Sequence, residues 1–228
     1  MNKIGDSLKG KRVLITQDKD FMGPALCQAF SEHGSIVISD SKPLLEADSA
    51  LNLINKAGQV DVLIVNLAIP APSTPAVEVS DEEWREVFSY MVDPLPRLFR
   101  AVLPQMIKRG SGKIVVMGSA SALRGMKRAS TYSAARGAQV SYVQAVGVEM
   151  AQHNIQINLI AQNFVDNPTY FPPEIQANEK FQARLKREVP AGRLATPEED
   201  ALFAVFLASS EVNFFIGQSF AFSGGWAW

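Results

Sequence analysis

The stretch GKIVVMGSASALRGMKRASTYSAARGA, residues 112–138, joins a buried strand to the start of a helix. Its residues 114–117, Ile-Val-Val-Met, form an apolar run of the kind found in strands that are covered on both faces. A second run of this kind, VDVLIVN, lies at residues 60–66. Apolar strands that alternate with helices predict a parallel sheet with helices packed against it.

The same alternation continues along the chain. We expect strands at residues 12–16, 35–40, 60–66, 112–119, 155–161 and 217–225, and helices at residues 23–34, 81–91, 95–110, 131–153 and 197–209. Ser80 and Thr196 are the expected N-caps of two of these helices. This order predicts an α/β fold: a single Rossmann-like, doubly wound, mostly parallel sheet with helices on both faces, forming one domain over residues 1–228. Ligands of such sheets bind beyond the carboxyl ends of the strands, so we expect the site there.

The composition argues against several classes of protein. Hydrophobic residues make up 47% of the 228 residues and charged residues 20%, so the chain can bury a full core. A net charge of −1 gives no reason to expect binding to nucleic acid or to an anionic membrane. The single cysteine, Cys27, and a start without an apolar leader favour a cytoplasmic location. His33 and His153 stand alone, so no metal site is expected.

Ser119, Tyr132 and Arg136 form a pattern that indicates acid–base chemistry. Tyr132 and Arg136 are four residues apart on a predicted helix, so they share one face. A neighbouring cation stabilises the phenolate form of a tyrosine and thereby makes it a better base. Ser119 ends a buried strand and can donate a hydrogen bond to an oxygen that Tyr132 deprotonates. Taken alone, Tyr-x3-Arg is more often an exposed pair on a helix; the serine at the strand end reverses that interpretation.

These residues carry a resemblance to a known family. The segment from Lys113 to Ala138 resembles the catalytic segment of the short-chain dehydrogenase/reductase superfamily. Further landmarks agree along nearly the whole chain: VDVLIVNLA, RAVLPQM, INLIAQNF, GRLATPEEDALFAVFLAS and GQSFAFSGG. The resemblance implies a Rossmann-like fold and, in most members, hydride transfer with a nicotinamide cofactor.

The loop that should bind this cofactor departs from the family pattern. Where the superfamily has Thr-Gly-x3-Gly-x-Gly, residues 16–23 read TQDKDFMG, and only Gly23 survives. Those glycines let the backbone approach a pyrophosphate at a helix N-terminus. Phe21 fills that space instead, and Asp18 and Asp20 repel phosphate. We therefore expect no nucleotide cofactor.

Three other positions depart from the pattern. Arg136 occupies the position where the superfamily has a lysine. Met91 occupies the position of the asparagine that, in the superfamily, takes part in a proton relay. Asp40 ends the second strand, where an acid would bind ribose, but a solvated strand-end carboxylate is the preferred interpretation. Only about twenty residues separate Asp40 from the next strand, so the walls of an adenosine pocket are expected to be truncated.

One enzyme family, the halohydrin dehalogenases, shows this combination, and the chain resembles it also in QNFVDNPTYFPPE (162–174) and in the aromatic terminus GGWAW. The resemblance implies reversible, cofactor-independent closure of a vicinal halohydrin to an epoxide with release of halide, and epoxide opening by azide, cyanide or nitrite. It implies Ser119, Tyr132 and Arg136 as catalytic residues, and a homotetramer as the assembly. The expected halide-binding residues are Phe21, Gln162, Asn163, Phe164 and Val165, with backbone amides around Phe164 and Val165 as the donors. The expected substrate-lining residues are Ala68, Ser121, Tyr170 and Phe171.

Some points remain open from sequence alone. Trp226 and Trp228 are expected to dock on a neighbouring subunit, with packing in their own subunit as the alternative. The charged run around residues 180–189 is expected to be the solvated face of a helix. The competing functions are an NAD(P)-dependent reductase with a degenerate loop and a non-catalytic ligand sensor.

Overall fold

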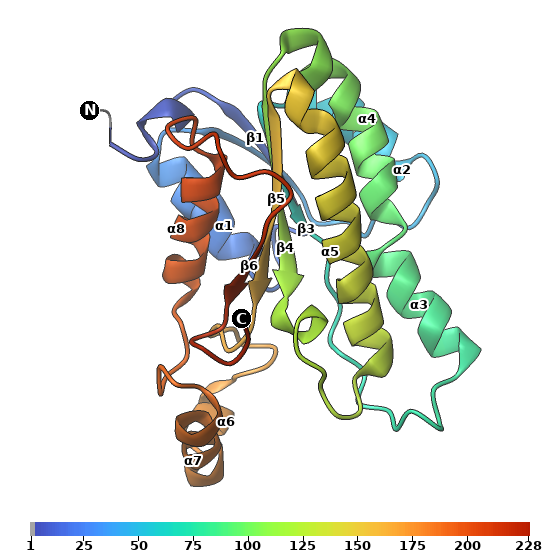
Figure 1. Cartoon of the computed structure of the whole chain (residues 1–228), viewed down its shortest axis with the longest axis vertical. Coiled ribbons are helices and arrows are strands. Elements are labelled where there is room, and N and C mark those ends of the chain that lie inside the picture. Colours follow the sequence, from blue (N-terminus) through green and yellow to red (C-terminus); the bar gives the residue numbers. More distant parts are fainter. Residues whose placement is uncertain (1–2) are drawn as a thin grey trace.

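The computed structural model describes residues 3–228, which form one six-stranded parallel sheet flanked by helices (Figure 1). The strand order is β2-β1-β3-β4-β5-β6, and every neighbouring pair is parallel. The strands are β1 (Arg12–Thr16), β2 (Ile36–Asp40), β3 (Val62–Asn66), β4 (Gly112–Ser119), β5 (Ile155–Gln162) and β6 (Ser219–Phe222). The predicted doubly wound α/β fold is therefore confirmed.

The helices lie on both faces of this sheet (Figure 1). They are α1 (Gly23–Glu32), α2 (Ser49–Ala57), α3 (Asp81–Met91), α4 (Pro94–Arg109), α5 (Ser130–Met150), α6 (Pro173–Gln176), α7 (Glu179–Glu188) and α8 (Pro197–Ala208), with one-turn helices at Asp6–Leu8, Ala120–Ala122 and Ala151–His153. Helices α1 and α8 cover one face, while α2, α4 and α5 cover the other.

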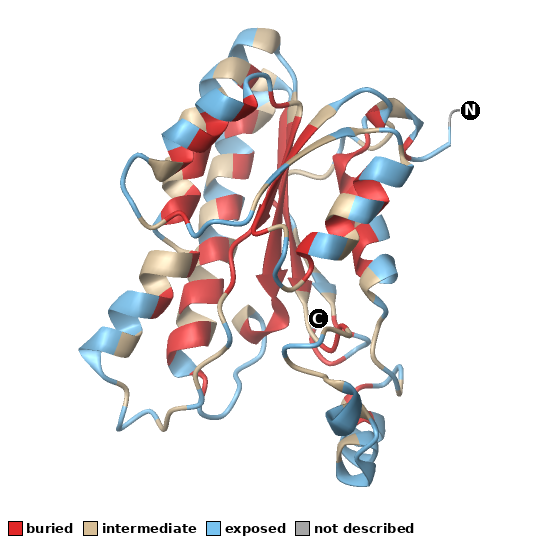
Figure 2. Ribbon diagram, turned by 180° about the vertical axis from the view of Figure 1, so that it is seen from behind, coloured by how far each residue is buried: buried red, intermediate tan, exposed pale blue. Residues whose placement is uncertain are grey.

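The central strand β3 shows why this sequence forms a sheet that is buried on both sides. All five of its residues are buried. Leu63 and Val65 belong to the core beneath α2, α4 and α5, whereas Val62 and Ile64 belong to the core beneath α1 and α8. Successive side chains of a strand point to opposite faces, so an unbroken apolar run supplies both cores. Figure 2 shows this central layer as the most continuously buried part of the molecule.

Two helix starts follow from capping residues in the sequence. The Ser80 hydroxyl accepts a hydrogen bond of 3.1 Å from the Glu83 amide at the start of α3. At the start of α8, Thr196 accepts from the Glu199 amide while the Glu199 carboxylate accepts from the Thr196 amide. Both caps satisfy amides that have no partner within the helix, so both predicted helix starts are confirmed.

The connection between β2 and β3 holds a helix that the sequence interpretation did not assign. Helix α2 is nine residues long and buries Leu53 and Ile54 against the core. The Asp40 carboxylate accepts a hydrogen bond from the Lys42 amide at the start of this connection. The segment is short, as expected, but its apolar residues recur at helical spacing and cover the sheet.

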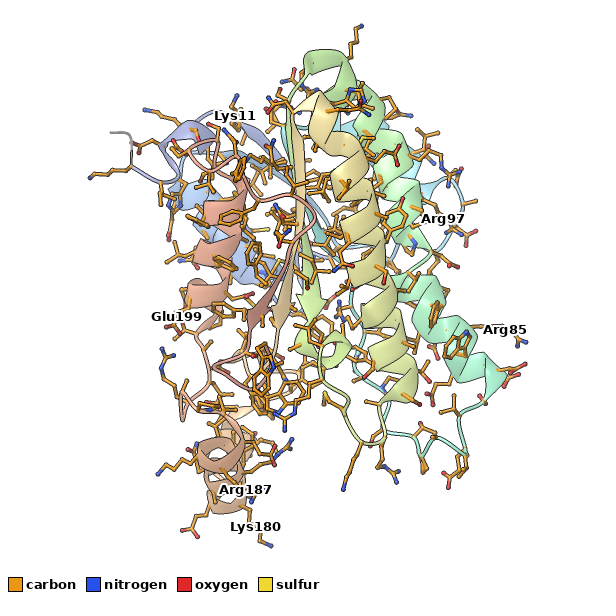
Figure 3. The ribbon with its side chains drawn as sticks, viewed as in Figure 1. Lys11, Arg85, Arg97, Lys180, Arg187 and Glu199 are labelled. Atoms are coloured by element: carbon orange, nitrogen blue, oxygen red, sulfur yellow. The ribbon has the colours of Figure 1, made fainter. Side chains whose placement is uncertain are left out.

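The carboxyl ends of the strands all meet at one end of the molecule, together with α6, α7 and the C-terminus (Figure 1). Helix α7 projects from this end, and its Lys180 and Arg187 point outward, as Figure 3 shows. The predicted solvated helix is confirmed for most of its length. Within residues 3–228, no helix is long and apolar enough to cross a membrane. The same residues contain no cluster of side chains suited to a metal ion.

Candidate active site

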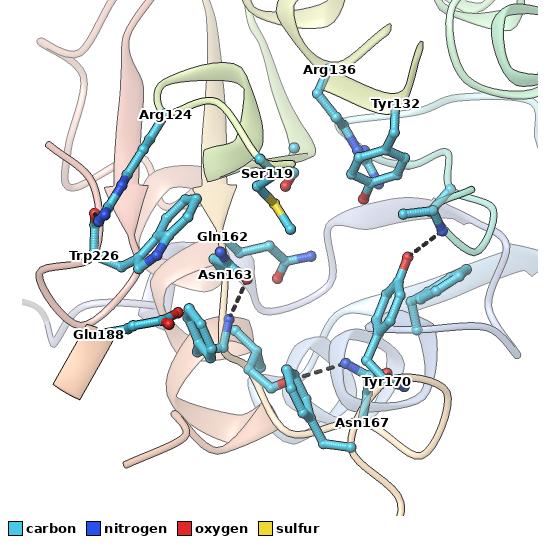
Figure 4. A pocket seen from close by; sticks show the side chains of 18 of the residues that line it. Ser119, Arg124, Tyr132, Arg136, Gln162, Asn163, Asn167, Tyr170, Glu188 and Trp226 are labelled. Atoms are coloured by element: carbon cyan, nitrogen blue, oxygen red, sulfur yellow. Dashed lines mark hydrogen bonds between the residues drawn. The ribbon is translucent and has the colours of Figure 1, made fainter. Parts of the chain in front are cut away.

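A cavity of about 660 Å³ opens where β1, β3, β4 and β5 end (Figure 4). It is lined by every predicted site residue except Ser121: Phe21, Ala68, Ser119, Tyr132, Arg136, Gln162, Asn163, Phe164, Val165, Tyr170 and Phe171. Residues that the sequence interpretation missed complete the lining: Met22, Ala71, Gly118, Arg124, Gly125, Met126, Lys127, Asn167, Arg184, Glu188 and Trp226. The loops that follow the strands therefore converge on one site, as parallel topology requires.

Ser119 is held so that its hydroxyl proton is free. Its Oγ accepts hydrogen bonds from the amide of Ser121 at 3.2 Å and from the Ser121 hydroxyl at 3.0 Å. A hydroxyl oxygen has two acceptor positions and one donor, so both acceptor positions are filled. The remaining proton can be donated to an oxygen atom in the cavity.

Ser121 supports the site from behind and does not line the cavity. It lies in the one-turn helix Ala120–Ala122, which begins after Ser119, and it is only 3% exposed. Its hydroxyl turns back toward Ser119, so the expected place of Ser121 in the substrate-facing lining is not found. Sequence spacing showed that Ser121 is near the site but not which way it faces.

Tyr132 and Arg136 share one face of α5, as their spacing predicted. The Arg136 guanidinium carbon lies 5.0 Å from the centroid of the Tyr132 ring. Both side chains are buried, at 8% and 3% exposure, and both line the cavity. The cation and the phenol therefore face the same cavity.

Backbone carbonyl groups position the Arg136 guanidinium. Its Nη1 donates to the carbonyl oxygens of Leu67 and Met117 at 3.2 and 3.0 Å, and to Gln139 Oε1 at 2.9 Å. Gln139 in turn donates to the carbonyl oxygen of Met91 at 2.7 Å. This chain ties the cation to β3, β4 and α3. The sequence signal for Gln139 was its place three residues after Arg136, on the same side of the helix.

In the loop after β1, two residues with side chains adopt a backbone conformation that favours glycine. Gln17 and Phe21 have positive φ angles of 48° and 50°, although they stand at two positions where the family pattern has glycine. This conformation is unfavourable for residues with a Cβ atom. Gly23 remains glycine because a Cβ there would lie 2.3 Å from the Gln17 carbonyl oxygen.

Side chains of this loop occupy the place of a phosphate cradle. Gln17 Oε1 accepts a 2.7 Å hydrogen bond from the amide of Ala68, and the Phe21 ring lies 5.8 Å from the Tyr170 ring. A pyrophosphate needs free backbone amides at close range. Here the Phe21 ring occupies this space, and the Asp18 carboxylate, which accepts from Ser39, adds negative charge beside it. The residues present do not fit a dinucleotide in the usual position.

Tyr170 crosses the cavity from the loop after β5 to the loop after β3. Its hydroxyl accepts a hydrogen bond from the Ala71 amide at 2.8 Å and donates to the Ile69 carbonyl oxygen at 3.5 Å. Burial raises the pKa of Tyr170 far above its ordinary value, and the neighbouring Tyr132 raises it further. Tyr170 is therefore a neutral hydroxyl group beside Tyr132.

The loop after β5 uses one of the expected anion donors internally. The Phe164 amide donates to Oδ1 of Asn163 at 2.9 Å, so it is not free for a ligand as the sequence interpretation expected. Phe164 has a positive φ of 56°. Among residues 3–228, the Val165 amide meets no acceptor. The loop thus leaves the Val165 amide unbonded and places the apolar ring of Phe164 in the cavity lining.

Trp226 packs against residues of its own chain. It is 6% exposed, and its ring lies 6.1 Å from Phe164 in an edge-on arrangement. Arg124 lies over the Trp226 ring at 4.7 Å and donates to its carbonyl oxygen at 2.6 Å. Trp228, by contrast, is 95% exposed.

The mouth of the cavity carries charged residues that sequence reasoning did not assign to the site. They are Arg124, Lys127, Arg184 and Glu188. Glu188 accepts from Arg184 at 3.0 Å and from Arg187 at 2.8 Å, and these hydrogen bonds lower its pKa. The run around residues 180–189 is thus a solvated helix with one edge at the cavity.

Residues 23–227 match the family described as enoyl-(acyl carrier protein) reductase. Among curated proteins, the chain is 29% identical to a 3-oxoacyl-[acyl-carrier-protein] reductase of Chlamydia trachomatis, over 96% of this chain and 88% of the relative. It is 26% identical to a reductase of the same name from Vibrio harveyi, over 95% and 87% of the two chains.

Two solved structures similar to this chain are described as dehalogenating enzymes. One, a "Dehalogenation enzyme", is 29% identical with a TM-score of 0.88 and covers 97% of this chain and 100% of its own. A halohydrin dehalogenase bound to ethyl (2S)-oxiran-2-ylacetate is 26% identical with a TM-score of 0.84, over 96% and 98% of the two chains.

Proposed function

Because the chain belongs to the short-chain dehydrogenase/reductase superfamily, and because side chains fill its nucleotide loop, we propose that it is a halohydrin dehalogenase. The observation that carries the proposal is a Ser–Tyr–Arg trio lining a cavity that Phe21, which stands in place of a glycine, also lines. The reaction needs a base and a place for a halide, and it transfers no hydride. It therefore needs no nicotinamide.

The first chemical step is proton removal from the hydroxyl group of a vicinal halohydrin. Ser119 donates a hydrogen bond to the substrate oxygen, since its own acceptor positions are filled by Ser121. Tyr132 accepts the substrate proton, and the Arg136 guanidinium lies beside its ring. Placing base and donor on one oxygen orients the substrate for the second step.

The second step closes the ring. The oxygen lone pair forms a bond to the neighbouring carbon, and the electron pair of the carbon–halogen bond leaves with the halide. No atom is transferred to or from a cofactor. The proton passes from Tyr132 to water. Ala68, Tyr170 and Phe171 line the space for the carbon skeleton.

The halide leaves toward the wall formed by Phe21 and the segment 162–165, all of which line the cavity. Such a site combines apolar surface with N–H donors, because an anion is costly to bury without them. In the reverse direction, azide, cyanide or nitrite occupies the same place and opens an epoxide.

The alternative function is an NAD(P)-dependent reductase. It is favoured by the relatives among the 3-oxoacyl-[acyl-carrier-protein] reductases, at 26–29% identity. A non-catalytic ligand sensor is the remaining alternative. Nucleotide binding distinguishes the reductase, and halide release distinguishes an enzyme from a sensor.

We also propose a homotetramer that works in the cytoplasm. The exposed Val148 on α5 and the exposed Trp228 are apolar surfaces that contacts between subunits would bury. The single cysteine is consistent with a reducing compartment. Size-exclusion chromatography coupled to light scattering tests the assembly.

The decisive experiment is halide release from a simple vicinal bromo-alcohol without nucleotide. We expect release by the wild type and a loss of about a thousand-fold or more in Tyr132→Phe, which removes the base. The phenylalanine variant keeps the ring that packs beside Arg136, so folding is preserved. An inactive wild type that binds NADPH would instead establish the reductase, and one that binds no nucleotide would favour the sensor.

A further inference from the structure

The charges that line the active-site cavity do not balance. Among the residues that the structure describes, its lining holds one carboxylate, Glu188, and four cations: Arg124, Lys127, Arg136 and Arg184. The whole chain has a net charge of −1, so this excess of positive charge is local to the cavity. A cleft lined by one sign of charge, with low-dielectric walls, focuses its field and attracts ligands of the opposite sign.

Partners within the protein do not cancel this charge. Glu188 accepts hydrogen bonds from Arg184 at 3.0 Å and from Arg187 at 2.8 Å, so two cations share one carboxylate. Within residues 3–228, the hydrogen bonds of Arg136 go to backbone carbonyl oxygens and to Gln139, which are neutral. The excess positive charge is therefore left for a ligand.

Two of the cations, Arg124 and Lys127, form no ion pair within residues 3–228. The Arg124 guanidinium lies over the Trp226 ring, 4.7 Å from its centroid, and its Nη1 donates to the Trp226 carbonyl oxygen at 2.6 Å. Its Nε and Nη2 have no acceptor among the same residues. A guanidinium held in this way presents a planar set of donors, which matches the oxygen atoms of a carboxylate or a phosphate.

A short, hydrogen-bonded segment joins Arg124 to the reacting groups. The Arg124 amide donates to the Ala120 carbonyl oxygen at 3.0 Å, in the one-turn helix that directly follows Ser119. Figure 4 shows Arg124 and Trp226 on one side of the cavity and Tyr132 on the other, with Ser119 between them in this view. A cavity of about 660 Å³ is larger than the two reacting carbons of a halohydrin need. The remaining space can hold a chain that reaches from Ser119 toward Arg124.

We propose that the substrates are halohydrins and epoxides that carry a negatively charged group, a carboxylate or a phosphate, and that Arg124 and Lys127 bind this group at the mouth of the cavity. The reacting oxygen then lies at Ser119 and Tyr132. The inference rests on the proposed dehalogenation and specifies its substrate class. The charged group takes no part in the bond changes: the proton still passes to Tyr132, and the halide still leaves from the neighbouring carbon.

The test compares bromide release from three vicinal bromo-alcohols. Two are anionic, 4-bromo-3-hydroxybutanoate and 3-bromo-2-hydroxypropyl phosphate, and the third is the neutral 4-bromo-3-hydroxybutanamide. The variants are Arg124→Gln, Arg124→Lys and Lys127→Gln. Lys180→Gln is the matched control, because Lys180 points outward from α7 (Figure 3) and does not line the cavity.

We expect the wild type to have a kcat/KM about ten-fold or more higher for at least one anionic substrate than for the amide. Arg124→Gln should lower this ratio by about ten-fold, because a charged group with several donors is lost. Arg124→Lys keeps the charge without the planar fork and should lower it less. Lys127→Gln should lower it by about two- to five-fold, as for an exposed ion pair. Lys180→Gln leaves the ratio unchanged.

The two anionic substrates distinguish the sources of the charge, since the preferred one identifies a carboxylate or a phosphate. Lys127 is exposed and forms no ion pair within residues 3–228, so Lys127→Gln tests the inference in an unperturbed fold even if Arg124→Gln disturbs the packing of Trp226.

Equal kcat/KM for the charged and the neutral substrates in the wild type would overturn the inference while leaving the dehalogenase intact. A preference for charged substrates that persists in both Arg124→Gln and Lys127→Gln would overturn it as well. If none of the three compounds releases bromide, the proposed function fails. Isothermal titration with 3-hydroxybutanoate and 3-hydroxybutanamide then decides the inference alone: tighter binding of the acid, weakened by Lys127→Gln, supports it, and equal binding overturns it.

Discussion

Two walls of one cavity are built in opposite ways. The proton-transfer wall, Ser119, Tyr132 and Arg136, stands on β4 and α5, and hydrogen bonds to backbone groups hold it. The proposed anion wall, Phe21 and the segment 162–165, begins at the last residue of β5 and otherwise lies on loops that contain residues with positive φ. Regular elements place the first wall, and strained loops with aromatic contacts place the second. Strain at such positions persists where the surrounding structure determines the conformation, and it concentrates at functional sites.

The largest effect is expected from Arg136→Met on the proton-transfer wall. The variant removes the hydrogen bonds that Arg136 gives to the carbonyl groups of Leu67 and Met117, and it removes the cation beside Tyr132. We expect halide release to fall by about a thousand-fold or more and stability to fall by about 2–4 kcal/mol. Urea unfolding and bromide release measure the two effects. Near wild-type turnover would show that the cation is dispensable.

Phe21→Gly and Phe21→Ala address the anion wall. Both remove the apolar ring from the cavity, so halide release should fall by roughly ten- to hundred-fold in each. Only glycine relieves the positive φ of 50°. Phe21→Gly should therefore be more stable than Phe21→Ala by about 1 kcal/mol in urea unfolding. Equal stability of the two variants would contradict the assigned backbone strain.

Ser121→Ala tests how Ser119 is positioned. The change removes the side-chain donor at 3.0 Å but keeps the backbone donor at 3.2 Å. We expect kcat for halide release to fall by about three- to ten-fold, with little change in KM, because Ser119 loses orientation and not its proton. Ser121→Thr keeps the hydroxyl and should restore most of the rate. A change in KM alone would instead place Ser121 against the substrate.

The smallest effect on turnover is expected at Asp200, which lies in α8 outside both walls. Burial raises its pKa from 3.8 to about 8, and neither carboxylate oxygen has a partner. Between these pH values the folded state holds a proton that the unfolded state has released, so stability falls as pH rises from 3.8 to about 8.

Asp200→Asn should flatten this dependence, and the wild-type pH profile of halide release should be retained. Thermal unfolding followed across this pH range checks the first expectation, and initial rates check the second. An altered activity profile in Asp200→Asn would link Asp200 to the site. A retained profile assigns the pH dependence of turnover to the groups in the cavity.

Much of the fold follows from local sequence pattern. The apolar runs at β3 and β4 and the caps at Ser80 and Thr196 are local signals, and the elements they predict are present. Helix α2 was not predicted because it is only nine residues long, although Asp48 and Gly58 at its ends are residues that favour helix caps. Its position follows from the tertiary structure, because Leu53 and Ile54 cover a face of the sheet that would otherwise be exposed.

For the candidate site as well, local sequence pattern predicted some features and only the tertiary structure decided others. The sequence by itself determined the trio, because strand-end position and four-residue helix spacing fix which side chains share a face. It also determined that the nucleotide loop lost its glycines. Only the tertiary structure decided that Ser121 turns back to Ser119, that the Phe164 amide is engaged by Asn163, and that Trp226 packs against residues of its own chain. Hydrogen-bond direction and long-range packing depend on which loops meet in space, and local spacing does not encode that.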